Sequence, residues 1–336
     1  MYRGILTGLG GRGRHWVRQT RLHSGGELIA FVEPSAAMRE RAIQELDLAP
    51  SSIFETLDQA LNAVEADFAL DVTPPRAHHE IARQAFDAGL HILGEKPLSD
   101  DFQTAKEVVA WGEAARRKHM ITQNYRFSAQ PRTTRQALAD GLIGKPGQCD
   151  VRFYMNWADI PGSHYVSQPY MLINDMMVHH FDMLRYVLGV DPVAVQAITW
   201  NHPWGWHRGD AAHAIVFEFA DGLHATHVSV GCAVGEMTPW NGEWRIEGPK
   251  GSITWDNAGR MWHSHLHRTE QRVREEIFPQ SVKPADQAIL DEFFAAIDQD
   301  RPPECSAADN LRSVAMVFAA ITSAKEKRRV QLDELK

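Results

Sequence analysis

A glycine-rich turn between a strand pattern and a helix pattern is the feature that most limits how this chain can fold. Arg3–Thr7 is a β-rich run, the spacing G-x-G-x-x-G falls on Gly8, Gly10 and Gly13, and a helix-like segment extends from about His15 to Leu22. In this context Gly8 permits the tight turn, Gly10 lets the backbone approach a pyrophosphate, and Gly13 lets helix and strand pack closely. The anion then sits at the helix N-terminus. The sequence therefore predicts a dinucleotide-binding domain.

The second predicted strand ends in an acidic residue that bears on the choice of dinucleotide. Leu28–Val32 reads as this strand and Glu33 follows it. A carboxylate there accepts hydrogen bonds from an adenosine ribose and repels a 2′-phosphate, so NAD is favoured. NADP stays open because Arg12, Arg14 and Arg39 lie close by in the sequence.

The alternation of strands and helices continues to about residue 124. Further strands are predicted at Phe68–Val72, His91–Gly94 and Met120–Gln123, with helices at His78–Ala88 and from a cap at Ser99 and Asp100 to about His119. This rhythm predicts a doubly wound parallel sheet whose ligand lies at the carboxyl ends of the strands. The residues at or just past those ends are expected to share one crevice: Gly8, Glu33, Thr73, Glu95, Lys96 and Asn124.

The remaining two thirds of the chain changes character near Arg126. A helix is predicted at Pro131–Asp140, and two more close the chain at Ala285–Asp298 and Ala307–Lys325. Between them β-rich runs dominate, several alternating polar with apolar residues as in a half-exposed antiparallel sheet: Cys149–Trp157, Val193–Asn201, Ala211–Phe219, His224–Val230, Glu243–Glu247 and Ser252–Trp255. We predict an α/β protein with a nucleotide-binding domain at 1–126 and a substrate and oligomerisation domain at 127–336.

The stretch from Leu172 to Gly189 reads as one two-faced helix. Its apolar stripe is Met177, Phe181, Leu184 and Leu188, and its polar side is Asp175, His179, Asp182 and Tyr186. Gly189 is suited to end it in a left-handed conformation. An imidazole one turn beyond a carboxylate can be tuned as a general base, although the same pattern also fits a helix with a solvated polar face.

Composition excludes several classes of protein. At 336 residues, with 44% hydrophobic and 23% charged residues, the chain suits two globular domains. A formal charge of −8 argues against nucleic-acid and anionic-membrane partners, and no apolar run approaches the roughly 20 residues that span a bilayer. Cys149, Cys232 and Cys305 form no C-x-x-C, which suits a reducing compartment. The N-terminus enters a strand pattern within a few residues, leaving no room for a signal peptide, so a cytoplasmic location is expected.

Four motifs together resemble a known family. Gly8-x-Gly10-x-x-Gly13, Thr73-Pro74-x-x-x-His78, Glu95-Lys96-Pro97 and Asp175-x-x-x-His179 occur in the order and spacing of the Gfo/Idh/MocA oxidoreductases. The resemblance spans essentially the whole chain. It implies a Rossmann domain followed by a domain with a large open-faced, mostly antiparallel sheet, which in that family often forms a dimer or tetramer interface. A homodimer or homotetramer is therefore expected.

The resemblance also implies roles for individual residues. Lys96 is similar to the family's catalytic lysine, and Asp175 and His179 resemble the pair on its active-site helix, where the histidine takes the hydroxyl proton. Pro75 departs from the pattern, because many members have Asn there. The Lys96–Pro97 bond is a candidate cis peptide. The expected cofactor contacts are Gly8, Leu9, Gly10, Arg12, Gly13, Glu33, Thr73, Pro74, His78, Glu95, Lys96 and Asn124.

Chemistry agrees with these roles. Oxidation of a secondary alcohol needs a base near pH 7 and a group that stabilises a developing alkoxide. A neutral imidazole and an ammonium supply both, because a nearby cation disfavours protonation of the imidazole.

The second half contains weaker candidates. Trp157, Trp204 and Trp206 can stack on a sugar ring, although sheet packing and a subunit interface explain most tryptophans equally well. Other candidate substrate contacts are Asn156, His164, Tyr165, Arg126 and Arg208, the two arginines hinting at an acidic group. His263, His265 and His267 alternate as on one strand face, but no cysteine or carboxylate is spaced to complete a metal shell, so no metal is expected.

Three functions fit these features. The leading one is an NAD-dependent dehydrogenase acting on a secondary hydroxyl of a sugar, polyol or related ring compound. The second is a glycosidase that uses NAD transiently to oxidise one ring carbon. The third is a redox-silent regulator that binds dinucleotide.

Overall fold

The computed structural model describes residues 1–156, 166–267 and 271–335, and the chain divides into two compact units. The first unit is Met1–Asn124 with Lys283–Val314, and the second is Tyr125–Val282 with Ala315–Lys336. The predicted boundary at 126 lies close to the observed one, but the prediction assigned everything after it to the second domain. Residues Lys283–Val314 instead complete the first unit, where Phe293 and Phe294 pack edge-on against Phe68 with centroids 5.8 and 5.5 Å apart.

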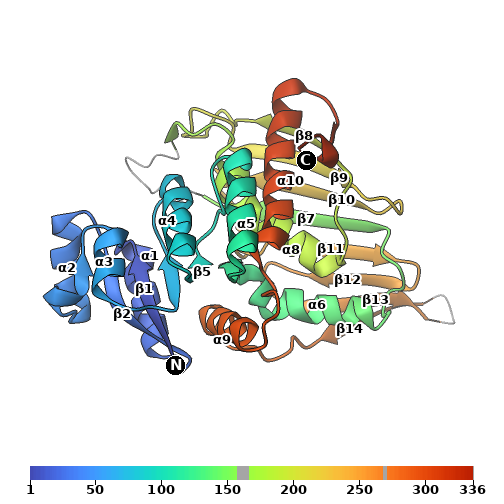
Figure 1. Cartoon of the computed structure of the whole chain (residues 1–336). Coiled ribbons are helices and arrows are strands. Elements are labelled where there is room, and N and C mark those ends of the chain that lie inside the picture. Colours follow the sequence, from blue (N-terminus) through green and yellow to red (C-terminus); the bar gives the residue numbers. More distant parts are fainter. Residues whose placement is uncertain (157–165, 268–270, 336) are drawn as a thin grey trace. The chain divides into compact units, whose positions relative to one another are not determined.

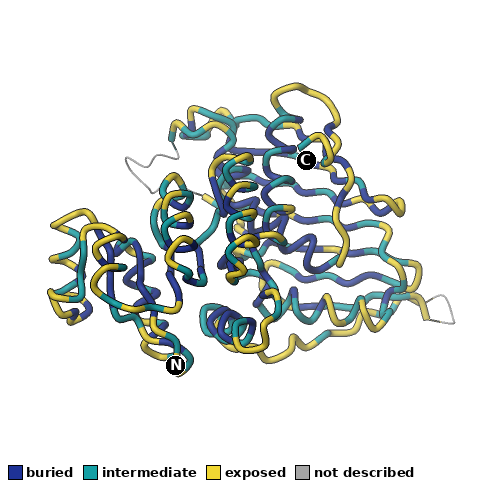
Figure 2. The backbone as a smooth tube through the Cα atoms, viewed as in Figure 1, coloured by how far each residue is buried: buried dark blue, intermediate teal, exposed yellow. Residues whose placement is uncertain are grey.

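The first unit is built on a six-stranded sheet (Figure 1). The strand order is β3-β2-β1-β4-β5-β6 and every pair is parallel. This is the doubly wound order that the alternation of strands and helices predicts, with its switch point beside β1. Strands β4 and β6 are buried throughout, and β1 is buried over its last four residues (buried residues are dark blue in Figure 2). The bounds are β1 Tyr2–Thr7, β2 Gly26–Val32, β3 Ile53–Phe54, β4 Phe68–Asp71, β5 His91–Gly94 and β6 His119–Ile121.

Helices connect these strands, and their first residues differ somewhat from prediction. The bounds are α1 Gly11–Arg21, α2 Ala36–Leu46, α3 Leu57–Ala63, α4 Pro75–Asp87, α5 Phe102–Ala115 and α9 Ala285–Asp298, with α10 Ala307–Glu326 contributing residues to both units. The cap of α5 is Asp101, whose carboxylate accepts from the Thr104 N–H at 2.8 Å, rather than Ser99 or Asp100. A carboxylate so placed satisfies one of the free N–H groups of the first turn. Short 3₁₀ turns lie at Pro50–Ser52, Asn124–Phe127 and Leu332–Leu335.

The second unit is built on a nine-stranded sheet in the order β14-β13-β12-β11-β7-β10-β9-β8-β15. Its described pairs are antiparallel except for β7 with β10. The mostly antiparallel sheet implied by the resemblance is confirmed. The strands are β7 Gln148–Tyr154, β8 Ala194–Trp200, β9 Ala212–Glu218, β10 His224–Val230, β11 Glu243–Gly248, β12 Gly251–Trp255, β13 Met261–Leu266, β14 Arg272–Ile277 and β15 Val330–Gln331.

The two faces of this sheet differ in burial. Cys149, Ile246 and Ile253 share a register row on one face and are completely buried. Helix α8 (Met177–Leu188) packs on that face, with Phe181 edge-on to Phe217 at 4.8 Å between centroids. The other face carries exposed residues such as Arg152 and Arg245, the alternation expected of a sheet covered on one side. Helix α6 (Ala129–Ala139) also belongs to this unit.

The single helix predicted from Leu172 to Leu188 is wrong in one respect. The structure has a short helix α7 (Met171–Asp175) and then α8, with Met176 between them. The backbone N–H groups of His179 and His180 both approach the Met176 carbonyl, at 3.0 and 3.4 Å, so α8 starts afresh at this point. Its polar side is not solvated, because His179, Asp182 and Tyr186 are all buried. Gly189 ends α8 with a φ of 71°, as predicted.

No helix among the described residues is long and apolar enough to cross a membrane. The three cysteines are buried and unpaired with one another.

Candidate active site

The glycine turn has the geometry that its spacing predicts. Gly8 has a φ of 93°, and a Cβ there would lie 2.7 Å from the Val72 carbonyl oxygen. At Gly13 a Cβ would lie 1.9 Å from the Gly8 carbonyl oxygen, so only glycine allows α1 to pack this closely. At Gly10, by contrast, a Cβ would meet no described atom within 4 Å. The turn is thus tightly packed at Gly8 and Gly13 and open at Gly10, where a pyrophosphate can approach the protein backbone.

The N-terminus of α1 is prepared for an anion. Gly10 occupies the N-cap position without a side-chain cap, and the first turn contains no acidic residue. The uncapped N–H groups of an eleven-residue helix carry partial positive charge, which favours a phosphate at this point.

Glu33 fastens the turn to the end of β2. One oxygen of its carboxylate accepts from the Leu9 N–H at 2.9 Å and the other from the Ser35 N–H at 3.0 Å, and the residue is buried. A carboxylate has about four acceptor sites. Capacity for ribose hydroxyls is therefore left after these two bonds are made.

The arginines that left NADP open all have carboxylate partners within the first unit. Arg39 pairs with Glu55 at 2.8 Å, and Arg14 pairs with Glu45 at 2.8 Å. Arg12 pairs with both Glu95 and Asp286. Guanidinium groups committed in this way are poorly placed to receive a 2′-phosphate, which agrees with NAD as the cofactor.

Glu95 is surrounded by donors. Its carboxylate accepts from Arg12 Nε at 2.6 Å, from Trp16 Nε1 at 2.7 Å and from the Lys96 N–H at 3.3 Å. Arg12 also pairs with Asp286 at 2.9 Å. The side chain of Arg12 therefore positions Glu95, and the part of Arg12 suited to a pyrophosphate is its backbone N–H at the start of α1.

His78 links the ends of two strands. Its Nε2 lies 2.8 Å from the Thr73 carbonyl and its Nδ1 lies 3.0 Å from the Pro97 carbonyl, with the ring buried. The Thr73 hydroxyl in turn donates to Asp71 at 2.6 Å. The imidazole thus positions the Thr73-Pro74 and Lys96-Pro97 segments instead of pointing at a ligand, and the Lys96–Pro97 bond is cis, as expected.

Asn124 gives a further indication that a ligand binds at the carboxyl ends of these strands. Its side-chain oxygen is buried and accepts no hydrogen bond from any described residue. Buried polar atoms are nearly always satisfied, if not by protein then by water or ligand. Together with the open side of the glycine turn and the uncapped α1, this orphaned acceptor fits a dinucleotide.

In the second unit, His179 lies in a cluster with Tyr125 and Asp175. The rings of Tyr125 and His179 are stacked, with centroids 4.5 Å apart and planes inclined by 20°. Burial, and then the charge of Asp175, raise the pKa of Tyr125 well above its ordinary value. Tyr125 is therefore neutral. The charge of Asp175 acts on Tyr125, and the ring of Tyr125 is stacked on the imidazole of His179. Tyr125 is not among the residues predicted from the sequence, although it directly follows the predicted cofactor contact Asn124.

Behind this cluster lies a chain of three buried histidines that the sequence did not reveal. His213 Nε2 lies 3.1 Å from His227 Nδ1, His227 Nε2 lies 3.0 Å from His180 Nδ1, and His180 Nε2 lies 2.9 Å from the Trp240 carbonyl. A carbonyl only accepts, so when the rings are neutral each of them carries its proton on Nε2. Burial lowers the pKa of His180 to about 4 and that of His213 to about 3, and it lowers the pKa of His227 well below its usual range.

Arg126 does not have the role predicted for it. It is 3% exposed, its guanidinium forms two hydrogen bonds with the Asp182 carboxylate, and it lies over the Tyr186 ring at 5.4 Å. An arginine buried in this way neutralises the polar side of α8. It is not available to a substrate, and the hint of an acidic substrate that it carried is withdrawn.

The other predicted substrate contacts are placed only in part. Asn156 is exposed and forms an isolated antiparallel β-bridge with Cys232. Arg208 is also exposed. Trp204 stacks on His202 at 4.4 Å and Trp206 on His207 at 3.9 Å. Trp157, His164 and Tyr165 lie outside the described residues.

A cavity of about 550 Å³ opens beside Tyr125 in the second unit. Among the described residues, its walls contain hydroxyl, amide and aromatic side chains and no charged one. They come from the segments on either side of β11 and β12 and from the start of α6. The lining residues are Tyr125, Ser128, Gln130, Met237, Thr238, Pro239, Trp240, Asn241, Asn257, Ala258 and Gly259.

A doubly wound unit with a glycine turn, in one chain with a second unit in which His179, Tyr125 and Asp175 cluster, is typical of a nucleotide-binding oxidoreductase. The sequence matches the oxidoreductase family with an NAD-binding Rossmann fold over residues 3–125 and the GFO/IDH/MocA C-terminal domain over residues 131–254. The chain therefore belongs to the GFO/IDH/MocA family of NAD-binding oxidoreductases.

Characterised relatives extend over most of the chain. A D-apiose dehydrogenase from Paraburkholderia graminis is 24% identical over 99% of this chain and 90% of its own length. An inositol 2-dehydrogenase from Rhizobium meliloti is 25% identical over 82% of this chain and 84% of its own length.

Solved structures have the same fold. An Agrobacterium radiobacter oxidoreductase in complex with NAD⁺, L-tartaric acid and magnesium has a TM-score of 0.89 at 19% identity, covering 100% of this chain and 99% of that one. A levoglucosan dehydrogenase in complex with NADH and levoglucosan has a TM-score of 0.83 at 19% identity, covering 98% and 99%.

Proposed function

We propose that this protein is an NAD-dependent dehydrogenase that oxidises a secondary hydroxyl group of a neutral sugar, polyol or related ring compound. The observation that carries the proposal is the cluster of the buried His179 with Tyr125 and Asp175, where Tyr125 also lines a cavity whose described walls carry no charged side chain. Relatives named for D-apiose and inositol support the substrate class.

His179 is proposed as the base that takes the hydroxyl proton. It is 6% exposed, so water competes little for its ring nitrogens. The stacked Tyr125 ring restricts rotation of the imidazole and holds it in one orientation. A positioned imidazole of this kind contributes typically 10²–10⁴-fold to the rate.

Asp175 is proposed to stabilise the imidazolium that forms once the proton has been transferred. Its charge acts on Tyr125, whose ring is stacked on His179, so a cation on His179 is also within the field of that carboxylate. Because Asp175 ends α7 and His179 lies in the first turn of α8, the break at Met176 sets their spacing.

Lys96 is proposed to donate to the oxygen as it becomes an alkoxide. The motif that contains Lys96 is fixed on both sides, by Arg12 and Trp16 at Glu95 and by His78 at Pro97. Bound NAD⁺ supplies the hydride acceptor in this reaction. The residues expected to hold it are the glycine turn, Glu33, Thr73 and Asn124.

The cavity supports a neutral substrate over an acidic or phosphorylated one. Ser128 and Thr238 offer hydroxyls, Gln130 and Asn241 offer amides, and Trp240 is 52% exposed and can stack on a ring. A phosphate or carboxylate is normally bound by arginine or lysine, and no described residue of either kind lines this cavity.

Oligomerisation through the uncovered sheet face is part of the proposal. Ile198 and Val216 point to that face and are 63% and 39% exposed. Apolar residues grouped on an exposed sheet are typical of a subunit interface. Sedimentation of the wild type and of an Ile198→Lys variant tests the expected dimer or tetramer.

A substrate screen tests the function. The chain is incubated with NAD⁺ and neutral sugars, polyols, sugar acids or glycosides, and NADH formation and glycoside cleavage are followed together. Stoichiometric NADH from a neutral polyol or sugar is expected. Glycoside cleavage without accumulation of NADH would instead identify the transient-oxidation glycosidase, and binding of NAD⁺ without turnover of any compound would identify a regulator.

Variants test the assigned residues once a substrate is known. His179→Ala and Lys96→Ala are each expected to lower kcat by about 10²–10⁴-fold while the Kd for NAD⁺ changes only a few-fold. His224→Ala and Lys145→Ala, at exposed positions of the second unit, are the matched controls. Full activity of either active-site variant would refute its role.

A further inference from the structure

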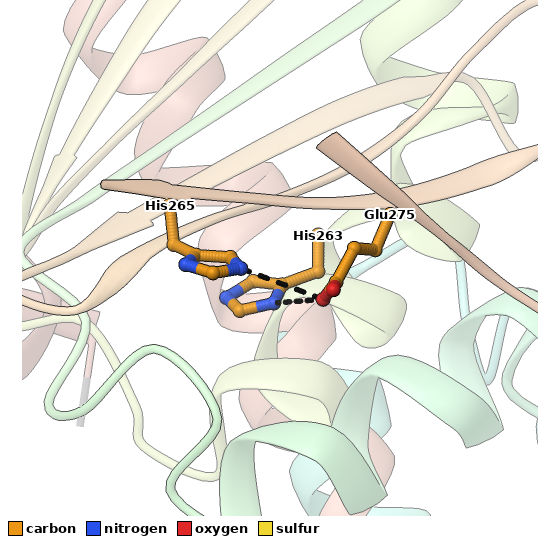
Figure 3. A group of neighbouring side chains, drawn as sticks. All are labelled: His263, His265 and Glu275. Atoms are coloured by element: carbon orange, nitrogen blue, oxygen red, sulfur yellow. Dashed lines mark ion pairs between the residues drawn. The ribbon is translucent and has the colours of Figure 1, made fainter. Parts of the chain in front are cut away.

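The edge of the nine-stranded sheet brings together three potential metal ligands from two neighbouring strands. His263 and His265 are alternate residues of β13, and Glu275 of β14 is the register partner of His263. Their side chains lie on the same side of the hairpin and point toward one another (Figure 3). His265 Nε2 lies 3.4 Å and His263 Nδ1 lies 3.8 Å from the same Glu275 oxygen.

These spacings are close to those of a coordination shell. Bonds of about 2.0–2.2 Å in a tetrahedral site put neighbouring ligand atoms roughly 3.3–3.6 Å apart. Ligand atoms of the three residues all lie within 4.8 Å of one another. Small rotations of the side chains therefore suffice to bring them onto one ion, and no movement of either strand is needed.

The histidines occupy an unusual place for polar side chains. His263 pairs directly with Ile253, which is completely buried on the helix-covered face of the sheet. His263 Nε2 is buried and has no hydrogen-bond partner among the described residues, and the 3.8 Å approach of Nδ1 to Glu275 is too long for a hydrogen bond. Nε2 of this ring thus has no hydrogen bond within the described protein, and Nδ1 has only the long approach to Glu275.

The surroundings close the cluster on one side and leave it open on the other. A Cβ at Gly251 would lie 3.1 Å from His263 Nε2 and 3.0 Å from His265 Cβ, so the glycine lets β12 pass close to both histidines. The side chains of His263 and His265 are 12% and 24% exposed, whereas that of Glu275 is 61% exposed. An ion can therefore enter from the side of Glu275, where water can complete its shell.

We propose that His263, His265 and Glu275 form a site for a divalent transition-metal ion, with Zn²⁺ the best match. Two imidazoles and one carboxylate are a common protein ligand set for Zn²⁺, and hard ions such as Mg²⁺ prefer oxygen ligands alone. The ion would join β13 to β14 and stabilise the edge of the sheet. It would contribute nothing to hydride transfer, since none of its ligands is among the residues assigned to that reaction.

Of these three ligands, only the two histidines are apparent from the sequence. The carboxylate comes from the neighbouring strand, and only the register of β13 against β14 places Glu275 rather than Glu276 opposite His263. Glu276 pairs with Trp262 and lies on the opposite face, which makes it a matched control.

Metal titration tests the site. The chain of residues 1–336, without a histidine tag, is freed of metal with EDTA, and ZnCl₂ is added in a calorimeter and in thermal melts. One equivalent of Zn²⁺ is expected to bind per chain and to raise Tm. Co²⁺ in place of Zn²⁺ should produce the intense visible bands of a four-coordinate ion.

Variants locate the bound ion. Glu275→Gln and His265→Ala, the two more exposed ligands, are each expected to weaken Zn²⁺ binding at least tenfold and to remove the Zn²⁺-dependent rise in Tm, without lowering the Tm of the metal-free chain. Glu276→Gln and His224→Ala should bind as the wild type does. Absence of saturable binding at micromolar Zn²⁺, or binding unchanged in both ligand variants, would overturn the proposal.

Discussion

The chain of buried histidines in the second unit makes this protein sensitive to acid. His180, His213 and His227 are at most 2% exposed and lie in one line of hydrogen bonds that ends on the Trp240 carbonyl. With every proton on Nε2, the Nδ1 of His227 accepts from His213, and the Nδ1 of His180 accepts from His227. A proton added to Nδ1 of His180 or His227 would set two N–H groups against each other, so the folded protein resists protonation there.

The sign and size of the effect follow from linkage. Folded pKa values lie below the ordinary 6.5, at about 4 for His180 and about 3 for His213, and well below 6.5 for His227. The unfolded chain therefore binds more protons once pH falls below about 6.5, and stability is lost from there down to about pH 3, where His213 of the folded protein is protonated. At about pH 5 each buried histidine costs about 2 kcal/mol, so the three together cost about 6 kcal/mol. That is a large part of the stability of an ordinary domain.

Urea unfolding measured between about pH 7.5 and pH 5 checks this expectation. Eight of the ten tryptophans lie between Trp157 and Trp262, so their fluorescence reports mainly on the second unit. Near pH 5 the free energy of unfolding should change by about 4 kcal/mol per pH unit from these three groups alone.

The informative variant is His227→Gln. An amide can donate to His180 and accept from His213, but it cannot take up a proton in this range, so the slope should fall by about 1.4 kcal/mol per pH unit. His224→Gln, on the same strand but exposed, should leave the slope unchanged. Equal slopes in wild type and His227→Gln, or NMR titration of these rings near pH 6.5, would refute the reasoning.

Three further changes have distinct expected outcomes. Arg126→Met removes the guanidinium that pairs with the buried carboxylate of Asp182 and should cost about 3–5 kcal/mol in urea unfolding, most of it recovered by adding Asp182→Leu. Gly13→Ala places a Cβ 1.9 Å from the Gly8 carbonyl oxygen, so the melting temperature of the first unit should fall sharply and NAD⁺ binding should be lost. Gly10→Ala meets no described atom within 4 Å, so calorimetry should show an unchanged Tm and weaker binding of NAD⁺. Wild-type affinity of Gly10→Ala for NAD⁺ would argue against a pyrophosphate at this turn.

Local sequence signals predicted the first unit well because its structure is dictated locally. The strand–glycine–helix order, the alternation of strands and helices and the X–Pro bond at Lys96 are all readable within short windows. Gly8 and Gly13 were also predicted correctly. Their close contacts lie at the ends of β1 and β4, which are neighbours in the expected doubly wound order. What could not be read was the return of α9 to this unit, since the sequence does not say which core an amphipathic helix covers.

Contacts between distant residues account for what the sequence did not disclose in the second unit. Arg126 looked like a ligand for an acidic group, yet its partner Asp182 is 56 residues away. The three histidines of the buried chain come from α8, β9 and β10, and Glu275 reaches His263 only through strand register. Each case depends on tertiary pairing, for which a single sequence carries no direct signal.

The division of the first unit between two distant stretches of chain has a consequence for its synthesis. Phe68, at the centre of the parallel sheet, is covered by Phe293 and Phe294, and Tyr2 stacks on Phe294 with centroids 5.4 Å apart. On the ribosome, the strands emerge more than 160 residues before the helix that seals them. The nucleotide-binding half is thus started first and finished last, and a nascent chain or fragment ending near residue 126 would present an open apolar surface for chaperones to shield.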